Sequence, residues 1–290
     1  MQRPFRAAGL LAALVLTSSA CGGGADAPAA DDGPVASAAA DCSPAGLETL
    51  EDGRLTIGTD SPAFEPWFSD DDPTNGEGFE SAVAYAVAEQ LGYARDDVEW
   101  TVAAFNSIVS PAEKPFDIAL NQVSITDERR QAVDFTSGYY TAAQTVITVK
   151  GSKLDGATGL AELKDAKLGA QVGTTSLVAI EEVVQPDQQP AVFDTNDVAK
   201  TQLQNGQVDG IVVDLPTAFY ITAAELDDGV IVGQLPATED AEQEEFGIVL
   251  DKDSPLTACA TAAVDALRED GTLAELEAEH LEGSGAPVLE

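Results

Sequence analysis

The chain has 290 residues, 44% of them hydrophobic, and carries 51 acidic residues against 14 lysines and arginines, so its formal net charge is −37. This length suits one large domain or two lobes, and the apolar content is sufficient for their cores. The charge excludes nucleic-acid binding, which depends on Lys and Arg patches that contact phosphate. The carboxylates instead indicate a solvated surface that keeps the protein soluble, also at high salt concentration.

The N-terminus predicts a signal peptide over residues 1–20. Arg3 and Arg6 form a positive start, residues 7–16 are apolar, and Ser-Ser-Ala-Cys follows. The apolar stretch is too short to span a membrane, and no later stretch approaches the roughly 20 apolar residues of a spanning helix. We therefore expect the remaining chain to be exported.

Cys21 follows the small residues directly, and with the Gly-Gly-Gly behind it the junction resembles the lipobox of bacterial lipoproteins. Ser18 stands where that motif usually has leucine, and ordinary cleavage that leaves Cys21 unmodified is the alternative. Residues 22–41 contain only Gly, Ala, Pro, Ser, Val and Asp. We expect a lipid on Cys21 and a disordered tether over residues 21–41, which hold the folded part at the outer face of the cell membrane.

Two cysteines remain after such processing, Cys42 and Cys259. In an oxidising compartment an even count favours a disulfide bond, although two buried free thiols are the alternative. A bond between them would close a loop of about 200 residues and stabilise the fold by up to about 5 kcal/mol in the entropic model.

From Leu55 onward short β-rich runs alternate with helical stretches, which is typical of α/β architecture with parallel strands. A helix is predicted over residues 79–93, because Val83, Val87 and Leu91 recur every four residues and Gly92 can end it. The strands predicted in this first set cover residues 55–60, 98–105, 116–123 and 132–136.

A second set of alternating units covers residues 160–235, and a strand over 246–252 and a helical region over 256–281 follow. Single strands at 144–149 and 246–250 separate the two sets. The simplest geometry is two lobes with two crossings between them and a ligand cleft at the facing strand ends. The first lobe would comprise residues 42–143 and 243–290, and the second residues 144–242.

Arg129 follows the predicted strand 116–123 after a short turn, where a group facing the cleft would emerge, and Thr126 can cap a short helix there. Arginine is the side chain best suited to hold a planar carboxylate through two charge-assisted hydrogen bonds. The alternative is a surface salt bridge with Asp127 or Asp134.

Further candidates lie at other strand ends. The Gly-Thr-Thr-Ser turn within residues 170–177 opens a helix and favours anions, although a plain helix start is the alternative. Asp214 ends a buried strand, where it can also be an N-cap, and Asp60 ends the first strand, where it can also be a turn residue. A guanidinium, an anion site and carboxylates together indicate a receptor for a zwitterion.

The sequence resembles the bacterial extracellular solute-binding proteins of family 3, the amino-acid receptors of ABC importers, from Leu55 to Leu281. The resemblance implies a two-lobe periplasmic-binding-protein fold that closes on its ligand by hinge motion, acts as a monomer and delivers an amino acid to a membrane permease. The stretches that carry it, in chain order, are GTDSPAFEPW, EGFESAVAYAVAEQLGY, FDIALNQVSITDERRQAVDF, GAQVGTTS and VDGIVVDLPTAFYI.

The resemblance also implies roles for single residues. Ser124 and Asp214 take the ligand α-ammonium, while Asp60, Phe64 and Phe105 align with the pocket wall. The α-carboxylate is taken by Arg129, Gly173, Thr174 and Thr175.

At two positions the sequence departs from the family pattern, because Asn121 and Gln122 replace small residues. Their polarity favours a polar amino acid, while Phe64, Trp67 and Phe105 leave an aliphatic one open.

Two other functions remain as alternatives. A lipid-anchored sensor needs the same cleft as an importer subunit, and relatives of this fold with dehydratase activity exist. Against an enzyme, the single histidine, His280, lies near the C-terminus, and no pair of nucleophile and base or metal cluster is evident. No cofactor is expected. Calcium is excluded at residues 70–72, because Asn75 stands where a calcium loop needs glycine.

Overall fold

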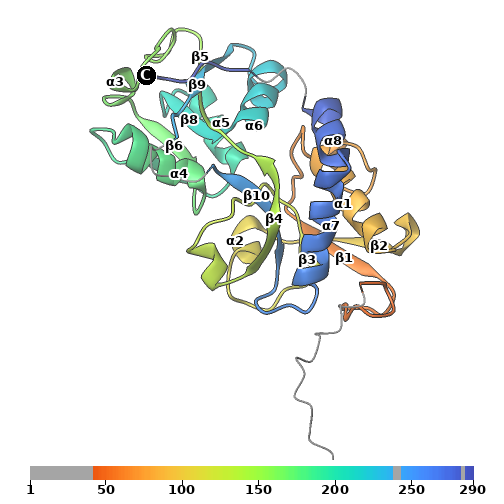
Figure 1. Ribbon diagram of the computed structural model, residues 1–290. Helices are drawn as coiled ribbons and strands as arrows, with labels where there is room; N and C mark the ends of the chain where they lie inside the picture. Colours follow the sequence, from red (N-terminus) through yellow and green to blue (C-terminus); the bar gives the residue numbers. More distant parts are fainter. Residues whose placement is uncertain (1–41, 238–242, 282–284) are drawn as a thin grey trace, which may run out of the picture. The chain divides into compact units, whose positions relative to one another are not determined.

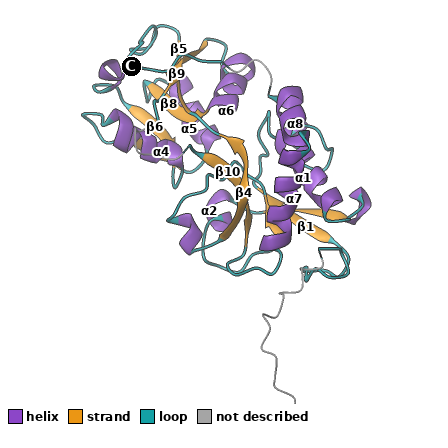
Figure 2. Cartoon of the chain, viewed as in Figure 1, coloured by secondary structure: helices purple, strands orange, loops and turns teal. Residues whose placement is uncertain are grey.

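The computed structural model describes residues 42–237, 243–281 and 285–290, coloured along the chain in Figure 1. The predicted signal peptide, Cys21 and the tether lie outside the described residues. Within them, helices and strands form an α/β fold with two five-stranded sheets (Figure 2). None of the helices in the described part is both long enough and apolar enough to cross a membrane.

The first sheet has the strand order β2-β1-β3-β10-β4. Strand β1 pairs in parallel with β2 and β3, whereas β10 is antiparallel to β3 and β4. The bounds are Leu55–Thr59 (β1), Val98–Val102 (β2), Ile118–Ala119 (β3), Asp134–Thr141 (β4) and Glu245–Leu250 (β10). The helices of this lobe are Phe79–Gln90 (α1), Phe105–Ile108 (α2), Thr257–Glu269 (α7) and Thr272–His280 (α8), with short 3-10 turns at Ser69–Asp71 (η1), Arg95–Asp97 (η2) and Arg129–Gln131 (η3).

The second sheet has the order β7-β6-β8-β5-β9. Strand β6 is parallel to β7 and β8, and β5 is antiparallel to β8 and β9. The strands are Gln144–Val149 (β5), Leu168–Gln171 (β6), Ala191–Phe193 (β7), Gly210–Asp214 (β8) and Gly229–Gln234 (β9). The helices are Leu160–Leu163 (α3), Thr175–Ala179 (α4), Asn196–Gln204 (α5) and Leu215–Tyr220 (α6), and the π-helical turns Ile180–Val184 (η4) and Ile221–Glu225 (η5) extend α4 and α6.

Between β1 and β10 the chain passes twice between the sheets. Strand β4 ends at Thr141 in the first sheet and β5 begins at Gln144 in the second, while β9 ends at Gln234 and β10 begins at Glu245 back in the first. The expected two-lobe α/β fold with two crossings is therefore confirmed.

The C-terminal end differs from the expectation that residues 243–290 belong to the first lobe. The Gln234 N–H donates to the Pro287 carbonyl at 2.8 Å, and the Leu289 N–H donates to the Gln234 carbonyl at 2.9 Å. Strand β9 is the last of its sheet, so its open edge accepts a further extended segment. This pairing buries Leu289 in the core of the second lobe.

Several predicted elements are shorter than expected. The strand predicted over residues 98–105 ends at Val102, and Phe105 begins α2. The strand predicted over residues 116–123 pairs only at β3, because the chain leaves the sheet around Gln122, whose φ of 48° lies in the left-handed region. The helical region 256–281 is divided into α7 and α8 at Gly271, which has a φ of 91°.

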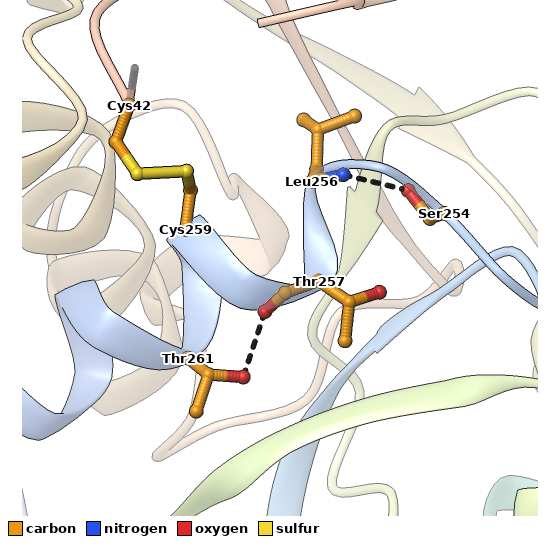
Figure 3. The surroundings of a disulfide bond; sticks show 6 residues. All are labelled: Cys42, Ser254, Leu256, Thr257, Cys259 and Thr261. Carbon is orange, nitrogen blue, oxygen red and sulfur yellow. Dashed lines mark hydrogen bonds between the residues drawn. A yellow bond between two sulfur atoms is a disulfide. The ribbon is translucent and has the colours of Figure 1, made fainter. Parts of the chain in front are cut away.

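The disulfide bond between Cys42 and Cys259 is present, which confirms that prediction (Figure 3). It ties the beginning of the described chain to α7, across a sequence separation of 217 residues. Cys259 is buried in the core of the first lobe, where α1, α7 and α8 pack together.

Candidate ligand-binding site

A pocket opens where strand ends of both lobes meet. Every residue predicted to bind ligand lines it except Gly173: Asp60, Phe64, Phe105, Asn121, Ser124, Arg129, Thr174, Thr175 and Asp214. Most of them follow a carboxyl end of a strand, with Asp60 after β1, Asn121 after β3, Thr174 after β6 and Asp214 at the end of β8. The pocket thus has the position that open α/β sheets give to their ligands.

Arg129 lies between the lobes. Its guanidinium donates to the Ser124 carbonyl of the first lobe at 2.7 Å and to the Gly173 carbonyl of the second at 2.9 Å. The guanidinium carbon lies 5.3 Å from the centre of the Phe105 ring, within cation–π range. Burial lowers the pKa of Arg129 to about 10, and the charges of Glu244 and Glu128 oppose the shift, so the group stays protonated at neutral pH.

The salt-bridge alternative for Arg129 is wrong. Asp134 pairs with Lys252 at 2.8 Å, and no ion pair among the described residues involves Arg129. Gly173 contributes its carbonyl oxygen and a left-handed backbone conformation. Its φ is +74°, and a Cβ there would lie 2.9 Å from Asn106 Oδ1, so a side chain would be strained.

Asp214 combines the two roles that the sequence left open. As the N-cap of α6 it accepts a hydrogen bond from the Thr217 N–H at 3.1 Å, and it also lines the pocket. Burial raises the pKa of Asp214 to about 6, and the nearby charge of Glu244 adds to this shift.

Asp60 is likewise held by its turn. One carboxylate oxygen accepts from the Ser61 N–H at 2.7 Å and the other from the Phe105 N–H at 3.0 Å. The aromatic wall differs in part from the prediction. Phe64 and Phe105 line the pocket, whereas Trp67 is fully buried in the first lobe and donates from Nε1 to Thr217 Oγ1 of the second at 2.8 Å.

Two carboxylates behind the pocket wall were not predicted. Glu80 of α1 is completely buried and accepts hydrogen bonds from the backbone N–H of Gln122 at 2.7 Å, from Gln122 Nε2 and from the Tyr139 hydroxyl. Burial raises the pKa of Glu80 to about 7, against the opposing effect of these hydrogen bonds. The contacts hold Gln122 in its left-handed conformation at the pocket.

Glu244 is the second of these carboxylates and precedes β10. Its Oε1 accepts from Ser124 Oγ at 2.5 Å, from Thr175 Oγ1 at 2.6 Å and from Gln144 Nε2 at 3.0 Å. Ser124 belongs to the first lobe, whereas Thr175 and Gln144 belong to the second. One carboxylate at the second crossing therefore joins both lobes.

Gln122, whose polarity entered the prediction of a polar ligand, also lines the pocket. Further wall residues were not predicted: Gln144, Gln171, Ser176, Asn196, Val213 and Phe246. Gln144 is the first residue of β5 and Phe246 the second of β10, so the crossings were the signal that could have indicated them. Among the described residues, no cluster of His, Cys, Asp and Glu has the arrangement of a metal site.

The chain is similar to known amino-acid-binding proteins in sequence and in fold. A probable histidine-binding protein of Neisseria gonorrhoeae is 26% identical over 96% of this chain and 96% of its own length. The structure of an ancestral arginine-binding protein bound to arginine is 30% identical, with a TM-score of 0.65 over 79% of this chain and 98% of that one. The ancestral amino acid-binding protein AncCDT-1, described as a precursor of cyclohexadienyl dehydratase, is 29% identical, with a TM-score of 0.63 over 79% and 96%.

The match to a family model covers most of the described chain, from residue 55 to residue 283. The matched residues extend over both lobes and both crossings and include Arg129. The chain belongs to the bacterial extracellular solute-binding proteins, family 3.

Proposed function

We propose that this protein is the receptor of an ABC importer and binds a polar amino acid through its α-carboxylate and α-ammonium groups. The observation that carries the proposal is that Arg129 and Asp214, groups of opposite charge from different lobes, line one pocket. A free amino acid bears the two complementary charges next to each other.

Arg129 binds the α-carboxylate. A guanidinium has five N–H donors, and two carbonyls occupy only part of them. The backbone N–H groups of Thr174 and Thr175 contribute, because the first turn of α4 leaves such groups without a partner inside the helix.

Asp214 and the Ser124 hydroxyl oxygen bind the α-ammonium. Charged hydrogen bonds contribute roughly 1.5–3 kcal/mol each, so three of them are comparable with the roughly 8 kcal/mol of a micromolar complex before entropy costs. Asn121 and Gln122, which line the pocket with amide groups, support a polar side chain.

The location follows from the N-terminal sequence. Cleavage after residue 20 and lipidation of Cys21 anchor the protein to the outer face of the membrane. Residues 21–41 then serve as a tether, and the monomeric receptor delivers its ligand to a membrane permease. Mass spectrometry of Cys21 from the native host tests the anchor, and an unmodified thiol would contradict it.

A sensor needs the same pocket, so neighbouring permease and ATPase genes distinguish it from an importer subunit. A dehydratase is the candidate of another class, since one structural relative is described as a dehydratase precursor. The support for a dehydratase is weaker, because Glu80, a carboxylate with a pKa of about 7, is completely buried behind the pocket wall.

Calorimetry of the purified protein with each of the twenty amino acids tests the function. Ligand at 100 times its dissociation constant should stabilise the fold by about 2.7 kcal/mol, so thermal unfolding gives a second readout. Arg129→Ala should abolish binding and keep the unfolding transition cooperative. Full affinity in this variant would disprove the assignment of Arg129.

A further inference from the structure

We infer that Glu80 and Glu244 make this pocket selective for an amino acid whose side chain is positively charged and rich in N–H donors. Neither carboxylate lines the pocket. Both determine which way the polar groups of its wall face. The inference rests on the proposed function and names the class of amino acid.

Glu244 turns two wall hydroxyls into acceptors. Ser124 and Thr175 each have a single hydroxyl hydrogen, and each donates it to Glu244 Oε1, at 2.5 and 2.6 Å. Only oxygen lone pairs then remain for a ligand. Gln144 likewise uses its donor on this carboxylate, because its Nε2 donates to Glu244, and its Oε1, which accepts from Ser176 Oγ at 2.6 Å, keeps one lone pair.

Glu80 has the same effect on the neighbouring part of the wall. It accepts both from the backbone N–H and from the side-chain nitrogen of Gln122. Because the amide nitrogen faces Glu80, the Gln122 oxygen is the atom left to a ligand. Gln122, Ser124 and Thr175 therefore all present acceptors. The α-ammonium uses Ser124, so a side chain that faces Gln122 and Thr175 must bring further donors.

The charges around the pocket also favour an amino acid with a positively charged side chain. Asp60 and Asp214 line the pocket against one cation, Arg129, and Glu244 contacts three wall side chains. Once the α-carboxylate has paired with Arg129 and the α-ammonium with Asp214, Asp60 and Glu244 still lack a countercharge. A cationic side chain supplies it, a neutral one leaves both uncompensated, and an acidic one adds repulsion.

The first test compares ligands by calorimetry on the unaltered protein. L-Arginine and L-citrulline have the same length and shape, but citrulline carries a neutral ureido group in place of the guanidinium. Arginine should bind about 10- to 100-fold more tightly than citrulline, the range for one or more charge-assisted hydrogen bonds, and more tightly than L-glutamine. L-Glutamate should show no binding.

The second test separates Glu244 from net charge. Glu244→Gln keeps the shape of the side chain, and Glu245→Gln removes the same charge from an exposed position one residue further along. The ratio of arginine affinity to citrulline affinity should fall about tenfold in Glu244→Gln and stay within about twofold in Glu245→Gln. An equal fall in both would overturn the role of Glu244.

Thr175→Val gives an independent test that needs no change at Glu244. If the hydroxyl accepts from the ligand side chain, the variant lowers arginine affinity more than citrulline affinity. If instead it donated to the α-carboxylate, both would fall equally, and the inference would be wrong.

The outcomes distinguish a failure of this inference from a failure of the proposed function. Amino-acid binding in which citrulline or glutamine equals arginine would overturn this inference and leave the proposed function standing. Binding of none of the twenty amino acids would overturn the proposed function itself. A high ratio that Glu244→Gln and Thr175→Val both reduce supports the inference.

Discussion

The two lobes hold their pocket groups by different means. In the second lobe the anchors are local, because Asp214 accepts from the Thr217 N–H and Thr174 from the Leu177 N–H, each three residues ahead. Both are N-caps of the helix that follows a strand. The helix starts on this side of the pocket are thus encoded within short segments of sequence, whereas the Thr175 and Ser176 hydroxyls bond to the more distant Glu244 and Gln144.

The first lobe uses contacts between distant segments. Glu80 holds Gln122 across 42 residues, and Asp60 accepts from Phe105 across 45. The surrounding core is aromatic, with edge contacts around Trp67. This side of the pocket therefore depends on the packing of the whole lobe, and a change in one buried group there should have the larger effect.

Glu80→Leu should give the largest loss of stability. It leaves the N–H groups of Gln122 and the Tyr139 hydroxyl without their buried acceptor, which costs about 3 kcal/mol or more in the free energy of unfolding. Urea unfolding measures it. Glu80→Gln keeps one acceptor oxygen and should lose clearly less, so equal losses would contradict the role given to these hydrogen bonds.

Asp214→Asn should affect binding and leave the helix in place, because asparagine is as good an N-cap as aspartate. Loss of the charge should weaken amino-acid binding by about 10- to 100-fold, the range for one charged hydrogen bond. Calorimetry should show a much smaller loss for the matching ligand that lacks the amino group. Equal losses would mean that Asp214 is only a cap.

The pH dependence of stability follows from two carboxylates, Glu80 in the core and Asp214 at the pocket. The pKa of Asp214 is raised from 3.8 to about 6 and that of Glu80 from 4.5 to about 7, in each case mainly by burial. The folded state therefore binds more protons than the unfolded state between about pH 4 and pH 7. These groups should lower the free energy of unfolding of the ligand-free protein as the pH rises through that window.

Urea unfolding across this range, compared with a Glu80→Gln, Asp214→Asn double variant, measures the effect. The free energy of unfolding of the double variant should depend less steeply on pH. A parallel dependence in both proteins would show that other groups control it.

This contrast between the lobes explains what the sequence could predict. The α/β alternation, the two crossings and the Cys42–Cys259 bond follow from periodicity and composition, and the structure confirms them. Asp214 and Thr174 were predicted as pocket residues because strand ends followed by caps are visible over a few residues. Arg129 was a candidate because it follows a strand end, and the family resemblance added its role at the α-carboxylate and the aromatic wall.

Glu80 and Glu244 could not be found in this way. Glu80 lies on a helix whose sequence pattern is that of an ordinary surface helix and does not indicate a buried carboxylate. Its partner Gln122 is in a different segment. Glu244 is one of the many carboxylates that we interpreted as solvated surface. Both become visible only when distant segments pack together, as does the pairing of Leu289 with β9.

Thr174→Ala should produce the smallest effect, because it removes a local anchor. Loss of an N-cap costs about 1 kcal/mol in the free energy of unfolding. Thr195→Ala removes the equivalent cap of α5 and is the matched control. Both variants should lose similar stability in urea unfolding, but only Thr174→Ala should weaken amino-acid binding, because Thr174 lines the pocket and Thr195 does not. If Thr174→Ala instead lost several kcal/mol, as expected of Glu80→Leu, the second lobe would depend on distant packing as the first one does.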